Sequence, residues 1–387
     1  MRIVYCIDTI SRLGGVEQVT VAKVNALARI PGNEMWVALA NCNDSAREKL
    51  ENVSVKDLGI HYYENDAKIG RFRAWTDYFK KRCLLRKRLK IALKELMPDV
   101  VISTGMSEKL FLPTLRIKSN PVFVREVHFS RFYRSEQAHS IPQWLAAKIG
   151  ELLDYRIAIK RYDKIVVLTE AEKKGIWEQW EKVTVIPNPI IMREELQSTC
   201  HSRLVISAGR LMWVKNFEAL INIWERVIRR HPDWILQICG EGDSRKGLEE
   251  QIERLGLNNH VFLKGYVPDV QEQMAQASIF VLTSRTEGFS LVTLEAMSIG
   301  LPCVVYNCPG GIRYVVKDGE TGFLVPMNDE DAFVEKVCLL IENEELRKTM
   351  GQAALRESKL YDIDTITQRW MELFQDLLAK KRGSVKE

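Results

Sequence analysis

Strand-like and helix-like segments alternate along almost the whole chain of 387 residues. Short apolar runs rich in β-branched residues, such as residues 204–208 and 278–283, are each followed by a longer helical segment. This alternation predicts parallel sheets, because parallel strands need long crossover connections and helices usually supply them. The length exceeds one ordinary core, so we expect two domains, residues 1–190 and 191–362, with the polar segment 197–202 as the linker.

The composition is that of a globular protein, with 46% hydrophobic and 28% charged residues. The net charge of +5 is too small to indicate an anionic partner by itself. We find no signal-peptide pattern and no apolar run long enough to cross a bilayer, and therefore expect a cytoplasmic protein. The eight cysteines form no C-x-x-C pair. We expect reduced, buried thiols, Cys6, Cys239 and Cys303 among them, and no zinc site.

A polar turn at residues 285–290 separates a strand-like run from a helical segment that starts at Leu291. Ser290 is expected at the N-cap, where the unpaired amides of a helix start attract anions such as phosphate. Glu287 lies in the turn, and Glu295 lies about one and a half turns into the helix. A carboxylate there would repel phosphate, but it could accept hydrogen bonds from two sugar hydroxyls. The alternative is an ordinary capped helix with two solvated carboxylates.

The pattern Glu-Gly-Phe-Ser-Leu-x-x-x-Glu-Ala in this turn resembles the signature of the retaining family 4 glycosyltransferases. The resemblance implies that Glu295 binds the ribose of a nucleotide and that Glu287 lies against the sugar of a nucleotide-sugar donor. The backbone that contacts the diphosphate would then be that of four consecutive residues, Gly288, Phe289, Ser290 and Leu291.

A second charged corner follows the strand-like run 204–208, in Gly209-Arg210-Leu211-Met212-Trp213-Val214-Lys215-Asn216. Arg210 ends the strand and Lys215 is expected to start a helix. Two cations at one junction are costly to place together unless an anion lies between them, and a diphosphate suits both side chains. The pattern Gly-Arg-Leu-x-x-x-Lys-Asn also resembles the diphosphate motif of the same family. The alternative is a pair of ordinary surface cations.

Three further loops follow predicted strands and contain glycines that let the backbone turn sharply. The resemblance places the loop of Gly14-Gly15 at the donor phosphates and the acceptor, a Gly-x-Gly loop beside the ligand, and the loop after Gly265 at the nucleotide base. The residues it assigns are Gly15, Gly242, Tyr266 and Val267. Plain tight turns are the alternative for all three loops.

Two more strand ends carry candidate ligand groups. His128 follows the run 121–127, at an edge where open α/β sheets bind ligands. The resemblance implies contact of His128 with the donor sugar, whereas a lone histidine is more often structural. Arg131 and Arg134 add positive charge for an acceptor phosphate. Pro309-Gly310-Gly311 opens another helix and is a weaker candidate for a phosphate or sugar site.

Residues 71–90 are strongly basic with interleaved aromatic side chains, and the helical pattern continues to about residue 97. A basic amphipathic helix can lie on an anionic membrane surface. We expect no nucleic-acid partner, because no base-reading motif accompanies the segment. A solvated helix face is the alternative.

Together these features predict an α/β protein with two Rossmann-like domains facing across a cleft, which the resemblance identifies as the glycosyltransferase B (GT-B) fold. It also implies that the helix of residues 363–387 crosses back onto the N-terminal, acceptor-binding domain. The implied activity is metal-independent transfer of a hexosyl unit, with retention, from a nucleotide sugar, and family habit favours a UDP-linked one. The acceptor would be a glycan or lipid-linked glycan, and no cofactor is expected.

The residues leave three other functions open. A nucleotide-sugar epimerase or phosphorylase would use the same fold and donor site. A non-catalytic module would bind the nucleotide sugar without forming a product. A nicotinamide-dependent oxidoreductase is the weakest alternative, because the G-x-G-x-x-G fingerprint is missing.

Overall fold

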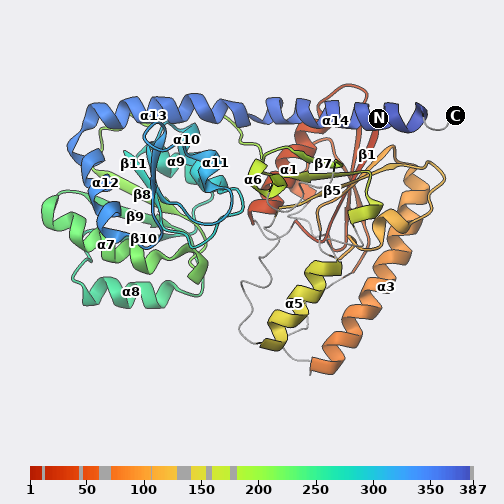
Figure 1. Ribbon diagram of the computed structural model, residues 1–387, viewed down its shortest axis with the longest axis horizontal. Helices are drawn as coiled ribbons and strands as arrows, with labels where there is room; N and C mark the ends of the chain where they lie inside the picture. Colours follow the sequence, from red (N-terminus) through yellow and green to blue (C-terminus); the bar gives the residue numbers. More distant parts are fainter. Residues whose placement is uncertain are drawn as a thin grey trace. The chain divides into compact units, whose positions relative to one another are not determined.

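The computed structural model describes residues 1–10, 14–42, 47–60, 71–105, 107–128, 141–153, 159–174 and 181–383. The chain forms two compact units (Figure 1). Unit 1 comprises Met1–Pro189 together with Ile363–Glu387, and unit 2 comprises Ile190–Asp362. The final helix therefore belongs to the same unit as the N-terminal half of the chain.

The described part of unit 1 contains a seven-stranded parallel sheet in the order β3-β2-β1-β4-β5-β6-β7. The strands are β1 Arg2–Ile7, β2 Glu34–Leu39, β3 Ser54–Asp57, β4 Val100–Ser103, β5 Val122–Glu126, β6 Lys164–Val167 and β7 Val183–Val185. The helices are α1 Gly15–Ala28, α3 Arg71–Leu96, α5 Ile141–Leu153, α6 Glu170–Glu172 and α14 Ile363–Gly383, with short 3₁₀ turns at Leu112–Thr114 and Ile159–Arg161.

Both faces of this sheet are covered, which explains why its strands are continuous apolar runs. Alternate residues of β1 enter two separate cores: Val4 packs with helix α3, and Tyr5 packs with α1 and α14. In Figure 1, α14 follows the upper side of the unit and α3 lies at its lower right. Trp370 and Phe374 of α14 are fully buried against the sheet, so the last helix is an integral part of unit 1.

Unit 2 is described throughout and has a six-stranded parallel sheet in the order β10-β9-β8-β11-β12-β13. The strands are β8 Leu204–Ala208, β9 Ile235–Cys239, β10 Val261–Gly265, β11 Ile279–Leu282, β12 Cys303–Tyr306 and β13 Gly322–Val325. The helices are α7 Phe217–Arg230, α8 Arg245–Arg254, α9 Val270–Ala275, α10 Leu291–Ser298, α11 Ile312–Val315, α12 Glu330–Glu342 and α13 Glu344–Ser358, with 3₁₀ turns η6 Trp213–Lys215 and η7 Lys359–Tyr361.

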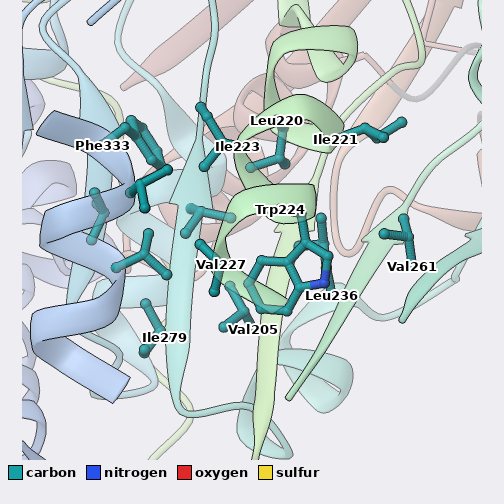
Figure 2. Packing of buried hydrophobic residues seen from close by; sticks show 14 of the residues in the cluster. Val205, Leu220, Ile221, Ile223, Trp224, Val227, Leu236, Val261, Ile279 and Phe333 are labelled. Carbon is teal, nitrogen blue, oxygen red and sulfur yellow. The ribbon is translucent and has the colours of Figure 1, made fainter. Parts of the chain in front are cut away.

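The core of unit 2 is centred on α7, which lays a buried apolar face over the sheet. Figure 2 shows the indole of Trp224 beside Val205 and Leu236, and Phe333 of α12 belongs to the same cluster. The indole nitrogen of Trp224 donates to the carbonyl of His260 at 3.0 Å, which satisfies a buried polar group. This packing fixes the loop that precedes α7, where Arg210 and Lys215 lie.

The prediction that residues 197–202 link the two domains is wrong. Cys200 in this segment is buried, and its carbonyl accepts a hydrogen bond from the buried Arg347 at 3.1 Å. The amide of Ser198 donates to the carbonyl of Ile299 at 2.9 Å. These hydrogen bonds and the burial of Cys200 hold the segment within unit 2. The boundary between the two units lies earlier in the chain, between Pro189 and Ile190.

The prediction of buried thiols is confirmed for six of the eight cysteines, whereas Cys42 is half-buried and Cys83 is exposed. All eight cysteines lie among the described residues and are free, and Cys6, Cys239 and Cys303 are buried. Burial raises the pKa of each of these three thiols, which makes them poor nucleophiles. No helix in the described part of the chain has the length and apolar character needed to span a bilayer.

Candidate active site

The candidate site lies where the strand order of unit 2 reverses. The chain runs outward from β8 to β9 and β10, and then returns to β11 on the other side of β8. The loops after β8 and β11 therefore leave the sheet edge in opposite directions. Open α/β sheets bind ligands at such a switch point, beyond the carboxyl ends of the strands.

Lys215 and Glu287 meet at this point and form an ion pair. The Nζ of Lys215 is 2.7 Å from Oε1 of Glu287, and the side chains are only 18% and 9% exposed. The hydroxyl of Ser284 donates to the same carboxylate oxygen at 2.6 Å. The sequence brings these groups together because Lys215 follows β8 and Glu287 follows its neighbour β11.

The sequence suggested that Arg210 and Lys215 need a bound anion between them. This ion pair shows that they do not. The carboxylate of Glu287 already balances Lys215, which closes the 3₁₀ turn η6 rather than starting a helix. Arg210 is exposed, with its Nη1 4.0 Å from the sulfur of Met212. An ammonium has three donors, so Lys215 can hold Glu287 and still bind a phosphate oxygen.

The start of α10 presents unpaired backbone amides beside this pair. The structure records no acceptor within the described residues for the amides of Leu291 and Val292, the first two of the helix. Unpaired amides and the helix dipole at this end favour an anion. The ring of Phe289 is buried and packs edge-on against Tyr361 at 5.6 Å between centroids, which anchors the turn.

Ser290 occupies the N-cap position, but the expected cap hydrogen bond is absent from this described segment. Its backbone is left-handed, with φ 54° and ψ 65°, and its hydroxyl lies 2.8 Å from Oγ1 of Thr293. The side chain of an N-cap residue reaches the N2 or N3 amide from extended backbone. The left-handed backbone turns the hydroxyl elsewhere, which leaves the first amides free for a ligand.

Gly240 and Gly242 are required by close backbone contact. A Cβ at Gly240 would lie 1.9 Å from the carbonyl oxygen of Gly209, and one at Gly242 would lie 2.3 Å from that of Leu211. The amide of Leu211 donates to the carbonyl of Glu241 at 2.9 Å. The Gly-x-Gly loop therefore supports the β8 corner that carries Arg210 and Lys215.

The structure uses one of the amides at the predicted second phosphate or sugar site, Pro309-Gly310-Gly311, for a contact within the protein, and ligand binding at this loop stays a prediction. The amide of Gly311 is already used, because it donates to the carbonyl of Glu287 at 3.0 Å. A Cβ at Gly310 would lie 1.8 Å from that same carbonyl oxygen. These glycines let the backbone pack directly under Glu287, and so they position that carboxylate.

Glu295 lies on α10, and burial raises the pKa of its carboxyl to about 7, with Asp269 raising it further and Lys215 opposing. The folded protein therefore holds a proton that the unfolded chain releases near pH 4.5. Stability from this group is complete below pH 4.5 and is lost as the pH rises through 7. The side chain of Glu295 is half-buried and has no hydrogen bond recorded among the described residues, which fits a group that awaits hydroxyl donors.

Replacing Glu295 by glutamine is expected to have opposite effects on stability and on binding. At pH 8 the variant should have a higher free energy of unfolding than the wild type, by on the order of 1–2 kcal/mol, and at pH 4 the two should coincide. Its affinity for UDP should fall, because an amide accepts ribose hydrogen bonds more weakly than a carboxylate. Calorimetric titration with UDP that gave an unchanged affinity would remove Glu295 from the ribose contact.

Two neighbouring residues that sequence reasoning missed extend the site. The guanidinium of Arg285 stacks on the exposed indole of Trp213 at 4.8 Å and donates to Oδ1 of Asn216 at 2.6 Å. Arg285 and Trp213 come from the two loops that carry Glu287 and Lys215. Their contact joins residues far apart in the sequence, so no local pattern could reveal it.

The remaining candidates lie on other loops. In unit 2, Tyr266 is exposed and Val267 half-buried directly after Gly265, at the end of β10. In unit 1, Gly15 is the exposed first residue of α1, with Gly14 at the N-cap. Their contacts with donor or acceptor stay predictions. Arg131 and Arg134 lie outside the described residues.

His128 follows β5 in a buried polar cluster of unit 1. Its Nε2 is 3.4 Å from Oε1 of Glu126, which also pairs with Lys23, and all three side chains are at most 2% exposed. Burial opposes the charge of Glu126, but Lys23 and His128 outweigh it and lower the pKa of this carboxyl to about 2. His128 therefore lies beside a negatively charged carboxylate, and its contact with a donor sugar stays a prediction.

Comparison with known proteins identifies the family. The model for Glycosyltransferase Family 4 matches residues 13–193, and the model for Glycosyl transferases group 1 matches residues 191–357. An uncharacterized glycosyltransferase of Haemophilus influenzae is 29% identical over 95% of this chain and 98% of its own length. The GalNAc-alpha-(1->4)-GalNAc-alpha-(1->3)-diNAcBac-PP-undecaprenol alpha-1,4-N-acetyl-D-galactosaminyltransferase of Campylobacter jejuni is 27% identical over 97% of this chain and 99% of its own.

Among solved structures, a mutant of Staphylococcus aureus TarM in complex with Fondaparinux, alpha-GlcNAc-glycerol and UDP superimposes with a TM-score of 0.75. The match covers 96% of this chain and 99% of that one, at 14% sequence identity. Two parallel α/β sheets and this likeness define the GT-B fold, which confirms the predicted fold class. The chain belongs to the group 1 and family 4 glycosyltransferases.

Proposed function

We propose that this glycosyltransferase moves a hexosyl or N-acetylhexosaminyl unit from a UDP-sugar to a hydroxyl of a glycan or lipid-linked glycan, with retention of configuration. The reaction would serve the assembly of a bacterial-type surface polysaccharide on the cytoplasmic side of the membrane. The observation that carries the proposal is the ion pair of Lys215 and Glu287 beside the free amides of α10. The relatives support the substrates, because their names include UDP and an undecaprenol-linked glycan.

The geometry suits departure of a diphosphate. As the bond between the anomeric carbon and the diphosphate oxygen breaks, negative charge grows on that oxygen. Lys215, Arg210 and the amides of Leu291 and Val292 lie on the loops that would receive it, and preorganised groups of this kind are the usual source of large rate enhancements. Glu287, neutralised by Lys215, can accept hydrogen bonds from the donor sugar without repelling the diphosphate.

Retention follows if the acceptor approaches on the side from which the diphosphate leaves. The acceptor oxygen then bonds to the anomeric carbon, and its proton passes to the departing diphosphate oxygen. This route needs no covalent intermediate on the protein. The α linkage in the name of the Campylobacter jejuni relative is compatible with retention from an α-linked UDP-sugar.

The proposal is tested by measuring UDP release from a panel of UDP-sugars with and without a lipid-linked glycan acceptor. A thermal-shift screen against UDP-, GDP- and ADP-sugars selects the donors first, because a bound ligand raises the apparent stability. A transferase releases UDP and lengthens the acceptor only when both substrates are present. Sugar interconversion without acceptor would instead show an epimerase, and saturable UDP binding without any product would show a binding module.

Metal independence is a separate expectation. Because Lys215, Arg210 and backbone amides would supply the positive charge, transfer should continue at an unchanged rate when EDTA is added. Product formation measured before and after EDTA, with magnesium added back, checks this directly. Complete loss of activity that magnesium restores would contradict a reaction driven by these protein groups alone.

A further inference from the structure

The described surface of unit 1 carries an apolar stripe on α5 that none of the described residues of the unit covers. Four large apolar side chains of this helix are exposed: Ile141 by 77%, Trp144 by 45%, Leu145 by 49% and Ile149 by 58%. Their spacing of three and four residues places them on one face of the helix. The Nζ of Lys148 lies 5.7 Å from the centre of the Trp144 ring, on the same face.

Helix α3 presents a stripe of different character. Lys80, Leu84, Lys87, Ile91 and Lys94 recur at intervals of four and three residues and are all exposed, while the opposite face is buried in the core. The helix holds ten Lys and Arg but only two acidic residues. Among the described residues, no carboxylate is recorded within ion-pair distance of the three lysines of the stripe. The positive charge of this stripe is therefore available to a partner.

We propose that α3 and α5 together dock unit 1 on the surface of an anionic lipid bilayer. The lysines of α3 would lie among the lipid phosphates, and the apolar stripe of α5 would enter the boundary between headgroups and acyl chains. Both helices extend beyond the sheet toward the lower edge of Figure 1. An exposed tryptophan with a neighbouring lysine is well suited to this boundary, because each has an apolar body and a polar end.

The choice of a bilayer rests on the mixture of side chains. A soluble polyanion would use the lysines of α3 but would gain nothing from Leu84, Ile91 or the four apolar side chains of α5. A second copy of this chain would have to bring its own basic α3 against the first, which like charges oppose. Only an anionic surface with an apolar interior satisfies both stripes. The proposal concerns where the enzyme works and does not depend on which sugar it transfers.

The test uses the full-length protein without nucleotide. It should co-sediment with vesicles containing phosphatidylglycerol but much less with phosphatidylcholine alone, and high salt should release most of it. The triple variant K80Q/K87Q/K94Q should bind anionic vesicles roughly 100-fold more weakly, because each basic residue near the surface is worth about fivefold. The matched variant K246Q/K359Q/K380Q loses the same charge elsewhere and should bind like the wild type.

A second variant separates insertion from electrostatic attraction. Lipids with brominated acyl chains should quench tryptophan fluorescence in the wild type. W144S/I149S should still bind anionic vesicles at low salt, but this quenching should be lost. Equal binding of wild type and K80Q/K87Q/K94Q, or a dimer in solution that W144S/I149S converts to monomer, overturns the proposal. UDP release with a water-soluble acceptor measures transfer independently and should be the same in all four proteins, so failure of docking and failure of the proposed function are distinguishable.

Discussion

Replacing Lys215 by alanine is expected to lower kcat/KM by about 10³-fold. The substitution removes the cation nearest to the proposed diphosphate site and also leaves the carboxylate of Glu287, which is 9% exposed, without its partner at 2.7 Å. A negative charge beside a leaving diphosphate opposes the same charge development that the lysine would stabilise. Steady-state kinetics at saturating acceptor measure the effect, and Lys246→Ala, on an exposed helix surface of the same unit, is the control.

A double variant decides which of the two roles of Lys215 matters. If the lysine contacts the diphosphate, Lys215→Ala combined with Glu287→Gln should stay well below the rate of Glu287→Gln alone. If it only neutralises Glu287, the double variant should recover fully to the rate of Glu287→Gln. Our account predicts partial recovery only, because one Nζ–H bonds to the carboxylate and the others remain for phosphate. A thermal melt of each variant confirms that the fold is kept.

Gly310→Ala is expected to destabilise unit 2 by about 3 kcal/mol and to weaken UDP binding at least tenfold, as order-of-magnitude values. The added Cβ would lie 1.8 Å from the carbonyl oxygen of Glu287, and the residue has φ +110°, which side chains disfavour. The backbone under Glu287 must move away, and the carboxylate moves with it. Urea unfolding and calorimetric titration with UDP measure the two effects.

Gly319→Ala is the matched control for this substitution. Gly319 also has a left-handed backbone, with φ +75°, but a Cβ there meets no atom within 4 Å. It should therefore cost only about 1 kcal/mol of conformational strain and leave UDP affinity unchanged. Equal effects of the two substitutions would show that strain alone, rather than contact with the Glu287 backbone, requires Gly310.

The fold could be predicted from the sequence because the sequence patterns of its strands and helices are local and recur along the chain. Each buried strand is a short apolar run, and each crossover helix has an apolar face, so alternation alone predicted parallel sheets. The same local patterns located the loops of Lys215 and Glu287. The local patterns could not show that Lys215 and Glu287 pair. The pairing requires that β8 and β11 are neighbours in the sheet, and no single segment of the sequence determines the strand order.

The failures of prediction share a physical cause. Ser290 has the sequence signal of an N-cap, but its backbone is left-handed, with φ 54°, in a turn fixed by the packing of Phe289 on Tyr361. Gly311 has the sequence signal of an amide that is open to an anion, but its amide donates to the carbonyl of Glu287. In each case a contact with a distant segment overrides the local preference.

The central claim is that a pyrophosphate binds between the β8 corner and the start of α10. A crystal structure of the protein with bound UDP tests it most directly. The account predicts phosphate oxygens within hydrogen-bond distance of Lys215 Nζ and of the amides of Leu291 and Val292, with the ribose hydroxyls on Glu295. A nucleotide found at another edge of the sheet, with Lys215 still bound only to Glu287, would contradict it.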